Sequence, residues 1–246
     1  MMNAVELKGL TFSYPGKPPV LRELELSVRQ GEIMTIAGLS GCGKTTLAHI
    51  ICGIIPHLIK GDLQGSVSLF GQDTRSLPVA KLAETAALVF QDSDEQMICT
   101  TVEDELAFGP ENLALAPAEI GERVHTEAAV CGLSGLLLRD PGTLSGGQKK
   151  LVALASVLTL TPRLIIFDEP LSGLDEKGRM LVAAQLRKLR SAGKTVLVIE
   201  HDLDAADAAI ADRWLILAEG MIAACDTPQR LRESRLLYEL ELRYDD

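Results

Sequence analysis

Hydrophobic and polar residues alternate along the first thirty positions of the chain. The alternating apolar positions are Val5, Leu7, Leu10, Leu24, Leu26 and Val28. Turn-forming residues at 14–16 and 18–19 separate the two runs. Alternation of this kind is typical of strands that bury one face, so we expect an antiparallel β-layer in this part of the chain.

Continuous apolar runs predict a second kind of strand in the rest of the chain. They cover residues 33–37, 164–167, 195–199 and 214–217, and shorter candidates lie at 66–70 and 87–90. Helical spacing separates the later runs, at 178–191 and 203–211. Because strands that alternate with helices are typical of a parallel sheet, we expect such a sheet at the centre of the fold.

The pattern becomes helical after Gln91 and remains so through residues 92–150, with proline and glycine residues between the helical stretches. We interpret this part as an inserted helical subdomain. From Gln229 to the end of the sequence, charged residues and leucines predict one further helix, which is too short to be a regulatory domain.

Composition restricts the classes of protein that fit. The 246 residues are 47% apolar, which suits one core or a core with a subdomain. Apolar stretches such as 151–160 are too short to span a membrane, and Glu6 precedes any signal-type apolar region. These features predict a cytoplasmic chain that does not cross a membrane. The net charge of −10 argues against a broad nucleic-acid-binding surface.

A glycine-rich stretch, GLSGCGKTT at 38–46, joins the apolar run 33–37 to a segment with helical spacing. G-x-x-x-x-G-K-[ST] between a strand and a helix is the phosphate-binding loop, whose glycines let successive backbone N–H groups point at an anion. The residues predicted to bind nucleotide are Gly38, Ser40, Gly41, Cys42, Gly43, Lys44, Thr45 and Thr46. Lys44 would reach the β- and γ-phosphates, and the Thr45 hydroxyl would bind Mg²⁺. The alternative, a glycine-rich turn that carries a lysine by chance, is disfavoured by the flanking strand and helix.

The five cysteines lie at positions 42, 52, 99, 131 and 225. Their number is odd and they lack metal-ligand spacing, which indicates a reducing compartment and no disulfide framework. We interpret Cys42 as a small loop residue and not as a redox sensor, and expect that its alkylation would block nucleotide entry.

Two carboxylates follow the apolar run at 164–167. In open α/β sheets, ligands bind beyond the carboxyl ends of the strands, so Asp168 and Glu169 are expected beside the phosphate loop. Asp168 suits the Mg²⁺ sphere, and Glu169 suits the position of a group that orients and deprotonates a water for attack on the γ-phosphate. An acidic strand-to-loop transition without function is the alternative, and its pairing with the phosphate loop disfavours it.

The sequence LSGGQ precedes a stretch with helical spacing, and its candidate ligands are Ser145, Gly146, Gly147 and Gln148. A serine and two glycines at a helix start form a second anion-binding terminus, although a capped helix without a ligand is an equal alternative for this motif taken alone. One nucleotide has no need of two such sites from one chain. We therefore expect a head-to-tail dimer with each nucleotide between the phosphate loop of one subunit and LSGGQ of the other.

Two further residues are candidates with structural alternatives. His201 follows the run 195–199 and is expected at the same sheet edge, where it would hydrogen-bond the γ-phosphate or the attacking water. Histidines in such places are more often structural. Tyr14 would stack on a purine or, equally, pack against Pro15 in a turn.

Taken together, these residues resemble the ATP-binding cassette family. The matching elements are GLSGCGKTT, Gln91 after a strand, LSGGQ, LIIFDEP, SGLD at 172–175 and His201, in that family's order. The resemblance implies an α/β fold of the P-loop NTPase class, with a mixed core sheet, an N-terminal antiparallel β-subdomain and an inserted α-helical subdomain. It implies ATP hydrolysis at two composite sites, with Gln91 sensing Mg²⁺ and coupling to a partner, Asp175 communicating across the dimer, and Tyr14 stacking on adenine. Leu151 and Leu171 depart from the family pattern, which often has arginine and threonine there.

Within that family, the stretch VFQDSDEQMICTTVEDELAFGPENLAL, together with FSYPG and LSGGQKK, is similar to the ATPases of energy-coupling-factor importers. This similarity implies a motor subunit at the cytoplasmic face of the cell membrane, as a homodimer or as a heterodimer with a related subunit. It also implies docking of the helical insertion on a transmembrane scaffold, the T component. A separate membrane component would bind the substrate, a vitamin or a transition-metal ion.

The alternatives are the ATPase of another transporter class of the same family, or a soluble cassette protein of DNA repair or translation. The soluble class is disfavoured because the sequence shows neither a long coiled-coil insertion nor a second cassette with a basic linker. A nucleotide-binding regulator without hydrolysis is disfavoured by Glu169 and His201.

We expect residues 1–246 to form a single ATPase domain with four parts. Residues 1–91 form the antiparallel layer and the first part of the nucleotide-binding core, and 92–150 form the helical subdomain with LSGGQ. Residues 151–228 complete the core, and 229–246 form the C-terminal helix.

Overall fold

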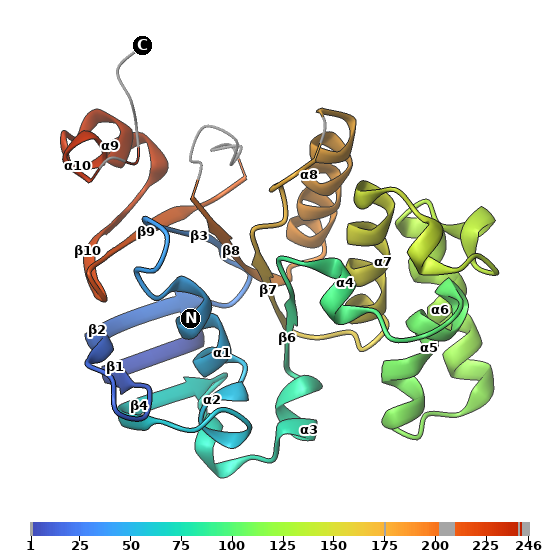
Figure 1. Cartoon of the computed structure of the whole chain (residues 1–246), viewed down its shortest axis with the longest axis horizontal. Coiled ribbons are helices and arrows are strands. Elements are labelled where there is room, and N and C mark those ends of the chain that lie inside the picture. The colour runs from blue at the N-terminus through green and yellow to red at the C-terminus, as the bar shows by residue number, and fades with distance from the viewer. Residues whose placement is uncertain (1, 175, 202–209, 241, 243–246) are drawn as a thin grey trace.

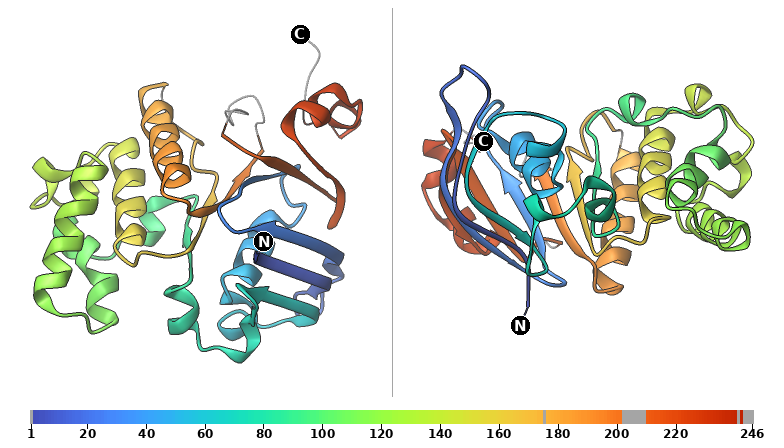
Figure 2. Two further views of the ribbon diagram at one scale, coloured as in Figure 1. Left: turned by 180° about the vertical axis from the view of Figure 1, so that it is seen from behind. Right: turned by 90° about the horizontal axis from the view of Figure 1, so that it is seen from below.

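The computed structural model describes residues 2–174, 176–201, 210–240 and 242. Two β-sheets lie side by side, and a group of helices lies at the end of the molecule away from the N-terminal sheet (Figures 1 and 2). This arrangement is the expected α/β fold with an antiparallel β-layer and an inserted helical part.

The N-terminal sheet has the strand order β2-β1-β4-β5 and is antiparallel throughout. Its strands are β1 (Asn3–Ser13), β2 (Pro19–Arg29), β4 (Asp62–Leu69) and β5 (Gln72–Asp73). The pairings Val5 with Val28 and Leu7 with Leu26 bring the alternating apolar residues to one face. The antiparallel layer predicted from the alternation is therefore confirmed, and the strand expected at 66–70 begins earlier, at Asp62.

The central sheet has the order β10-β9-β3-β8-β7-β6, in which only the β10–β9 pair is antiparallel. Its strands are β3 (Ile33–Ala37), β6 (Ala86–Val89), β7 (Leu164–Asp168), β8 (Thr195–Glu200), β9 (Arg213–Ala218) and β10 (Met221–Asp226). The apolar runs predicted every strand of this sheet except β10. Residues 221–225 of β10 are also apolar but were not predicted as a strand, and none of them is fully buried because β10 lies at the edge of the sheet.

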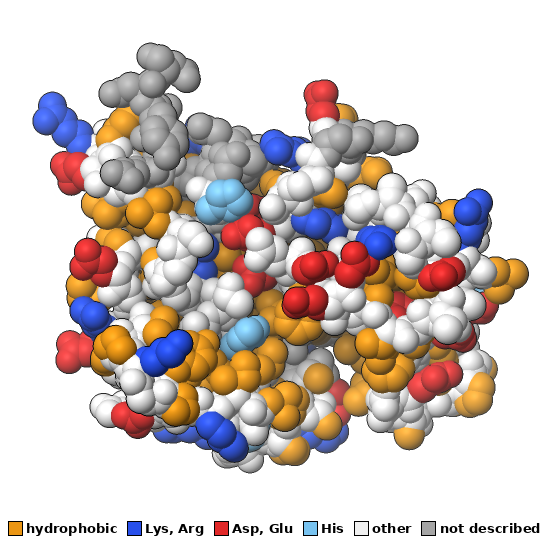
Figure 3. All heavy atoms as spheres, viewed as in Figure 1, with side chains coloured by type: hydrophobic (Ala, Val, Ile, Leu, Met, Phe, Trp, Pro, Cys, Tyr) orange, Lys and Arg blue, Asp and Glu red, His pale blue; other side chains and the backbone are white. Residues whose placement is uncertain are grey.

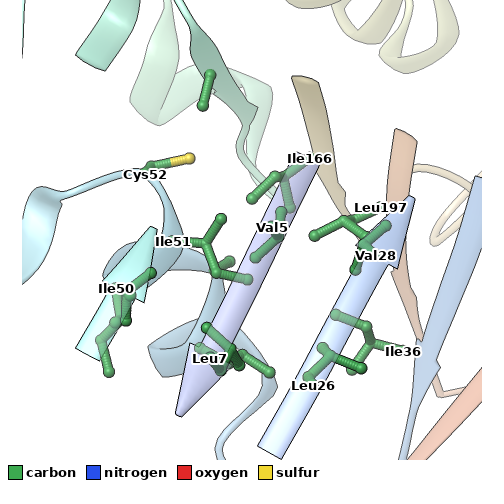
Figure 4. Close-up of a cluster of buried hydrophobic side chains, with 14 of the residues drawn as sticks. Val5, Leu7, Leu26, Val28, Ile36, Ile50, Ile51, Cys52, Ile166 and Leu197 are labelled. Atoms are coloured by element: carbon green, nitrogen blue, oxygen red, sulfur yellow. The ribbon is translucent and has the colours of Figure 1, made fainter. Parts of the chain in front are cut away.

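Alternate residues of the central strands enter two separate hydrophobic cores, one on each face of the sheet. Met34 and Ile36 of β3 belong to the core shared with the N-terminal sheet, whereas Ile33 belongs to the other. Figure 4 shows Ile36, Ile166 and Leu197 pointing into the first core. Since both faces are covered, these strands read as continuous apolar runs in the sequence.

The longer helices divide between these two cores, whereas Leu231 and Leu237 near the C-terminus pack in a third, smaller core with Trp214 and Ile216. Helix α1 (Lys44–Ile51) packs in the first core, and α7 (Gly146–Leu158) and α8 (Glu176–Ser191) pack in the second. The helical insertion also contains α4 (Ser93–Gln96), α5 (Val102–Asn112), α6 (Pro117–Val130) and the 3₁₀ turns Ser134–Leu136 and Pro141–Thr143. Shorter elements before it are α2 (Ile54–His57), the 3₁₀ turn Thr74–Ser76 and α3 (Val79–Ala83). The helix predicted at 203–211 falls mainly on 202–209, outside the described residues.

The C-terminal part differs from the single helix predicted from Gln229 onwards. It forms two short helices, α9 (Pro228–Glu233) and α10 (Leu236–Glu239). The break lies at Ser234, whose backbone is extended and whose hydroxyl donates to the carbonyl of Leu231, in competition with helix continuation. Among the described residues, no helix combines the length and apolar character needed to cross a membrane.

Candidate nucleotide-binding and catalytic site

The glycine-rich loop lies between β3 and α1, as predicted, and two of its glycines are required by the geometry. Gly43 has φ +108°, and a Cβ there would lie 2.7 Å from Leu21 Cδ2. A Cβ on Gly38 would lie 2.2 Å from the carbonyl oxygen of Leu217. Gly41 also has a left-handed φ of +80°, with open space beside it. The loop thus keeps its shape only with glycine at these positions.

Lys44 begins α1 and is buried, with 6% of its surface exposed. Its ammonium donates to the carbonyl oxygens of Gly38, at 2.7 Å, and Leu39, at 3.0 Å. The lysine therefore spans the same loop whose backbone N–H groups are expected to receive phosphate. Ser40 is exposed on the loop and Cys42 is half-buried. Burial raises the pKa of the Cys42 thiol, which fits a packing role and not a reactive one.

Thr45 and Asp168 meet at the carboxyl ends of β3 and β7. The Thr45 hydroxyl donates to Asp168 Oδ2 at 2.8 Å, and Asp168 is only 4% exposed. Burial raises the pKa of Asp168, and the hydrogen bond from Thr45 opposes this shift. A hydroxyl and a buried carboxylate are oxygen donors of the kind that Mg²⁺ prefers, so this pair fits the metal role predicted for it.

Thr46, the next residue of α1, contacts Tyr14 of the N-terminal part of the chain. Its hydroxyl shares a hydrogen bond of 3.0 Å with the hydroxyl of Tyr14, and the Tyr14 ring lies edge-on to Phe12, with 4.9 Å between ring centroids. Tyr14 thus adjoins the phosphate loop. Its stacking on a purine stays a prediction.

Glu169 is the centre of the three residues predicted to be catalytic. Gln91 Nε2 donates to its Oε2 at 2.7 Å, and His201 Nδ1 lies 3.4 Å from its Oε1. The backbone of Glu169 has φ +48°, and its N–H donates to the carbonyl of Ile199 on β8. A left-handed conformation is uncommon for a residue with a side chain, and such strain is frequent at functional sites. The side chain is 17% exposed, which leaves the carboxylate accessible to water.

Two charged residues near Glu169 were not predicted from the sequence. Glu200, the last residue of β8, is 1% exposed, and its carboxylate accepts a hydrogen bond of 3.1 Å from the N–H of Leu171. Burial raises its pKa to about 7. Lys150 of α7 donates to backbone carbonyls of the segment 169–172. The only sequence signals were a carboxylate at the end of an apolar run and a lysine two positions after LSGGQ.

The turn Ser145–Gln148 begins α7 with a reciprocal cap. Gln148 N–H donates to Ser145 Oγ at 3.3 Å, and Ser145 N–H donates to Gln148 Oε1 at 3.0 Å. Each side chain thus accepts the backbone N–H of the other residue. The glycines between them line a hollow of about 550 Å³ together with leucines of the neighbouring elements. Leu151, where the family often has arginine, is buried in this wall.

The phosphate loop leads into α1 and the Ser145–Gln148 turn leads into α7, and these two helices pack on opposite faces of the central sheet. Figure 3 shows a band of acidic side chains across the middle of one face, between the N-terminal sheet and the helical part. Asp175, the last of the predicted nucleotide contacts, lies outside the described residues.

Comparison with known families identifies this arrangement. The model of the family described as ABC transporter matches residues 21–172, which include the phosphate loop, Gln91, the LSGGQ turn and both acids. The chain belongs to the ABC transporter family. Its cassette is therefore that of an ABC ATPase, as the motifs predicted.

Two similar proteins narrow the comparison within the ABC family. The energy-coupling factor transporter ATP-binding protein EcfA of Methanosarcina acetivorans is 37% identical over 241 residues, which cover 98% of this chain and 84% of that protein. The solved structure of CbiO1 from Clostridium perfringens, described as part of the ABC transporter complex CbiONQ, matches with a TM-score of 0.83 and 27% identity. The match covers 99% of this chain and 96% of that one.

Other ABC relatives are longer than this chain. In four of them, from Methanosarcina and Saccharolobus species and 35–39% identical, the match spans only 34–46% of the relative's length.

Proposed function

We propose that the chain is the ATP-hydrolysing motor subunit of a membrane importer of the energy-coupling-factor type, which takes up a vitamin or a transition-metal ion. The observation that carries this proposal is the contact of Gln91 and His201 with the Glu169 carboxylate. The names of EcfA and of the CbiO1 complex support the importer class.

The backbone N–H groups of the phosphate loop and Lys44 would bind the β- and γ-phosphates of ATP. Lys44 would exchange its present carbonyl partners for phosphate oxygens. Thr45, Asp168 and Gln91 would hold Mg²⁺, which supplies positive charge against the phosphates when bound.

Glu169 would orient the attacking water and accept its proton as the new oxygen–phosphorus bond forms and the bond to ADP breaks. Gln91 Nε2 and His201 flank the carboxylate and would hold it in line. His201 would also donate a hydrogen bond to the γ-phosphate. Tyr14 would stack on adenine.

Two chains would enclose two nucleotides, each between one phosphate loop and the Ser145–Gln148 turn of the other chain, with Asp175 at the boundary. The backbone N–H groups of Gly146 and Gly147 at the start of α7 suit a γ-phosphate. The second chain would be a copy of this one or a related subunit.

The segment after Gln91 suits a docking surface for a transmembrane scaffold. Ile98 is 66% exposed and Phe108 is 44% exposed, whereas the Glu105 carboxylate accepts the N–H groups of Ile98 and Cys99 and fixes that segment to α5. Gln96 links the same segment to α7 by donating to the carbonyl of Ala153. Movement of Gln91 would therefore reach the exposed apolar side chains, at the cytoplasmic face of the membrane.

A tagged form of the chain, captured from its native membranes in detergent, tests this function by the proteins that co-purify. We expect a polytopic scaffold and a small substrate-binding membrane protein. Recovery of transmembrane domains that form their own substrate pathway would indicate another ABC transporter class. Soluble partners alone would leave the ATPase chemistry and overturn the transport role.

A further inference from the structure

The Lys150 ammonium donates hydrogen bonds to the backbone of the segment that carries Glu169. It donates to the carbonyl oxygens of Glu169 at 3.1 Å, Pro170 at 3.3 Å and Ser172 at 2.6 Å. An ammonium has three N–H donors, so these contacts account for all of them. The lysine lies in the first turns of α7, two positions after Gln148, and thus joins the helix of the LSGGQ turn to the catalytic segment.

The segment 169–172 is held from its other side by Glu200, whose carboxylate accepts the N–H of Leu171. Lys150 and Glu200 therefore fix the carbonyl and the amide groups of one short segment from two different elements. Burial lowers the pKa of Lys150, and the charges of Glu200 and Glu169 oppose that shift. These opposing carboxylates favour a charged ammonium that donates three hydrogen bonds.

The LSGGQ turn also lies close to the chain beyond this segment, since Gly147, Leu174 and Gly178 line the same hollow. A Cβ on Gly147 would lie 3.8 Å from Leu174 Cδ2 and 3.9 Å from Gly178 Cα. The turn is thus a near neighbour of the continuation of the segment that Lys150 holds. A shift at the start of α7 would be passed on by the lysine's hydrogen bonds.

We propose that Lys150 is a positioning residue that couples occupancy of the Ser145–Gln148 turn to the placement of Glu169 in the same chain. The inference rests on the proposed function, in which the partner's nucleotide occupies that turn. Phosphate at the turn of one subunit then sets the acid that acts on the nucleotide at that subunit's own phosphate loop. The two composite sites become cooperative, and their coupling is reciprocal in binding free energy.

Lys150→Met tests the coupling, because it keeps the apolar stem and removes the three donors. ATP turnover is measured against ATP concentration in the full chain purified with its membrane partners, and ATP affinity is measured separately. We expect a sigmoidal wild-type curve, a curve for Lys150→Met that loses its sigmoidal form, and a turnover number that falls roughly tenfold to a hundredfold. ATP affinity at the phosphate loop should stay within about threefold, since Lys150 does not touch that loop. Lys150→Arg, whose guanidinium also carries several donors, should restore part of both effects.

Lys194 offers a matched control for loss of stability. Its ammonium donates to the carbonyls of Thr161, at 3.3 Å, and Pro162, at 2.7 Å, and burial lowers its pKa as well. It lies just before β8, at the end of the strands away from the site. Lys194→Met should lower the melting temperature and leave turnover and the shape of the curve unchanged.

The outcomes separate the inference from the proposed function. The coupling would be overturned if the Lys150 and Lys194 variants changed ATP turnover and the shape of its curve equally, or if the wild-type curve were not sigmoidal. Either result would leave the ATPase role in place. Absence of ATP turnover in the wild-type complex would overturn the proposed function and the coupling with it.

Discussion

The phosphate loop and the segment 169–172 lie at the same edge of the central sheet, but they are held in different ways. The polar contacts of Lys44 stay within the loop, on the carbonyls of Gly38 and Leu39, and its left-handed glycines set the shape of its backbone. The segment is fixed by Gln91, Lys150 and Glu200, which come from three separate parts of the chain. Nucleotide binding should therefore depend on local changes, whereas hydrolysis should also respond to distant ones.

The largest expected effect is the loss of ATP affinity after a glycine of the phosphate loop is replaced. Gly43→Ala places a side chain at φ +108°, a conformation that residues with a Cβ rarely adopt, and brings that Cβ within 3.3 Å of the Val20 carbonyl oxygen. The loop is therefore strained, and ATP binding should fall by more than about a hundredfold. Isothermal titration with ATP measures this loss. Gly71→Ala is the control, because Gly71 has a left-handed φ of +84° with open space beside it and lies in the turn between β4 and β5 of the N-terminal sheet. Comparable losses of ATP affinity in both variants would contradict local control of binding.

A smaller loss of ATP affinity is expected from the Thr45–Asp168 hydrogen bond, which joins the phosphate loop to the strand before the segment 169–172. Thr45→Val removes the hydroxyl that reaches Asp168, so ATP affinity measured with Mg²⁺ should fall roughly tenfold to a hundredfold. Affinity measured with EDTA should change little, since the loop itself is kept. If the variant lost affinity equally with and without Mg²⁺, the metal role of this pair would be wrong.

Glu200, which holds the segment 169–172, should make the stability of the protein depend on pH. Its pKa of about 7 lies above the ordinary value of 4.5, so the folded state takes up a proton between these values and stability falls as pH rises through about 7. The charges that face it are Lys150 from α7 and Glu169 and His201 at the strand ends. Glu200→Gln can still accept from Leu171 N–H. The free energy of unfolding of wild type should fall between pH 5 and pH 8, whereas that of the variant lacks this contribution. The difference between variant and wild type should therefore shift by about 2 kcal/mol in favour of the variant between pH 5 and pH 8.

Urea denaturation of both proteins at the two pH values measures this difference. An equal difference between variant and wild type at pH 5 and pH 8 would show that Glu200 does not titrate in this range.

The smallest effect is expected at the start of α7. Ser145→Ala removes the side-chain half of the reciprocal cap with Gln148 and should lower stability by about 1 kcal/mol. Thermal denaturation measures it. Ser191→Ala is a suitable comparison, because its hydroxyl is exposed and donates only to the carbonyl of Arg187 in its own helix. An equal loss in both variants would argue against a special role of the cap.

The same contrast explains how much the sequence could predict. The two sheets, the phosphate loop and the convergence of Gln91, Glu169 and His201 follow from apolar periodicity and from motifs at strand ends. Lys150 and Glu200 could not be predicted, because a lysine in a helix and a carboxylate after an apolar run are ordinary patterns. Their roles arise only when α7 and β8 meet the segment 169–172. Strand β10 was missed although residues 221–225 are apolar. The break at Ser234 was missed because it depends on one side-chain hydrogen bond.

The central claim is that Glu169 performs hydrolysis on a nucleotide shared by two chains. Glu169→Gln keeps an oxygen for hydrogen bonding but cannot accept the proton of water, so it separates binding from turnover. The decisive measurement is the mass of this variant with ATP and Mg²⁺ in the presence of its membrane partners, together with its ATP turnover. The account predicts a stable ATP-bound dimer and a turnover at least about a hundredfold below wild type. A variant that binds ATP and stays monomeric, or that hydrolyses ATP at the wild-type rate, would contradict it.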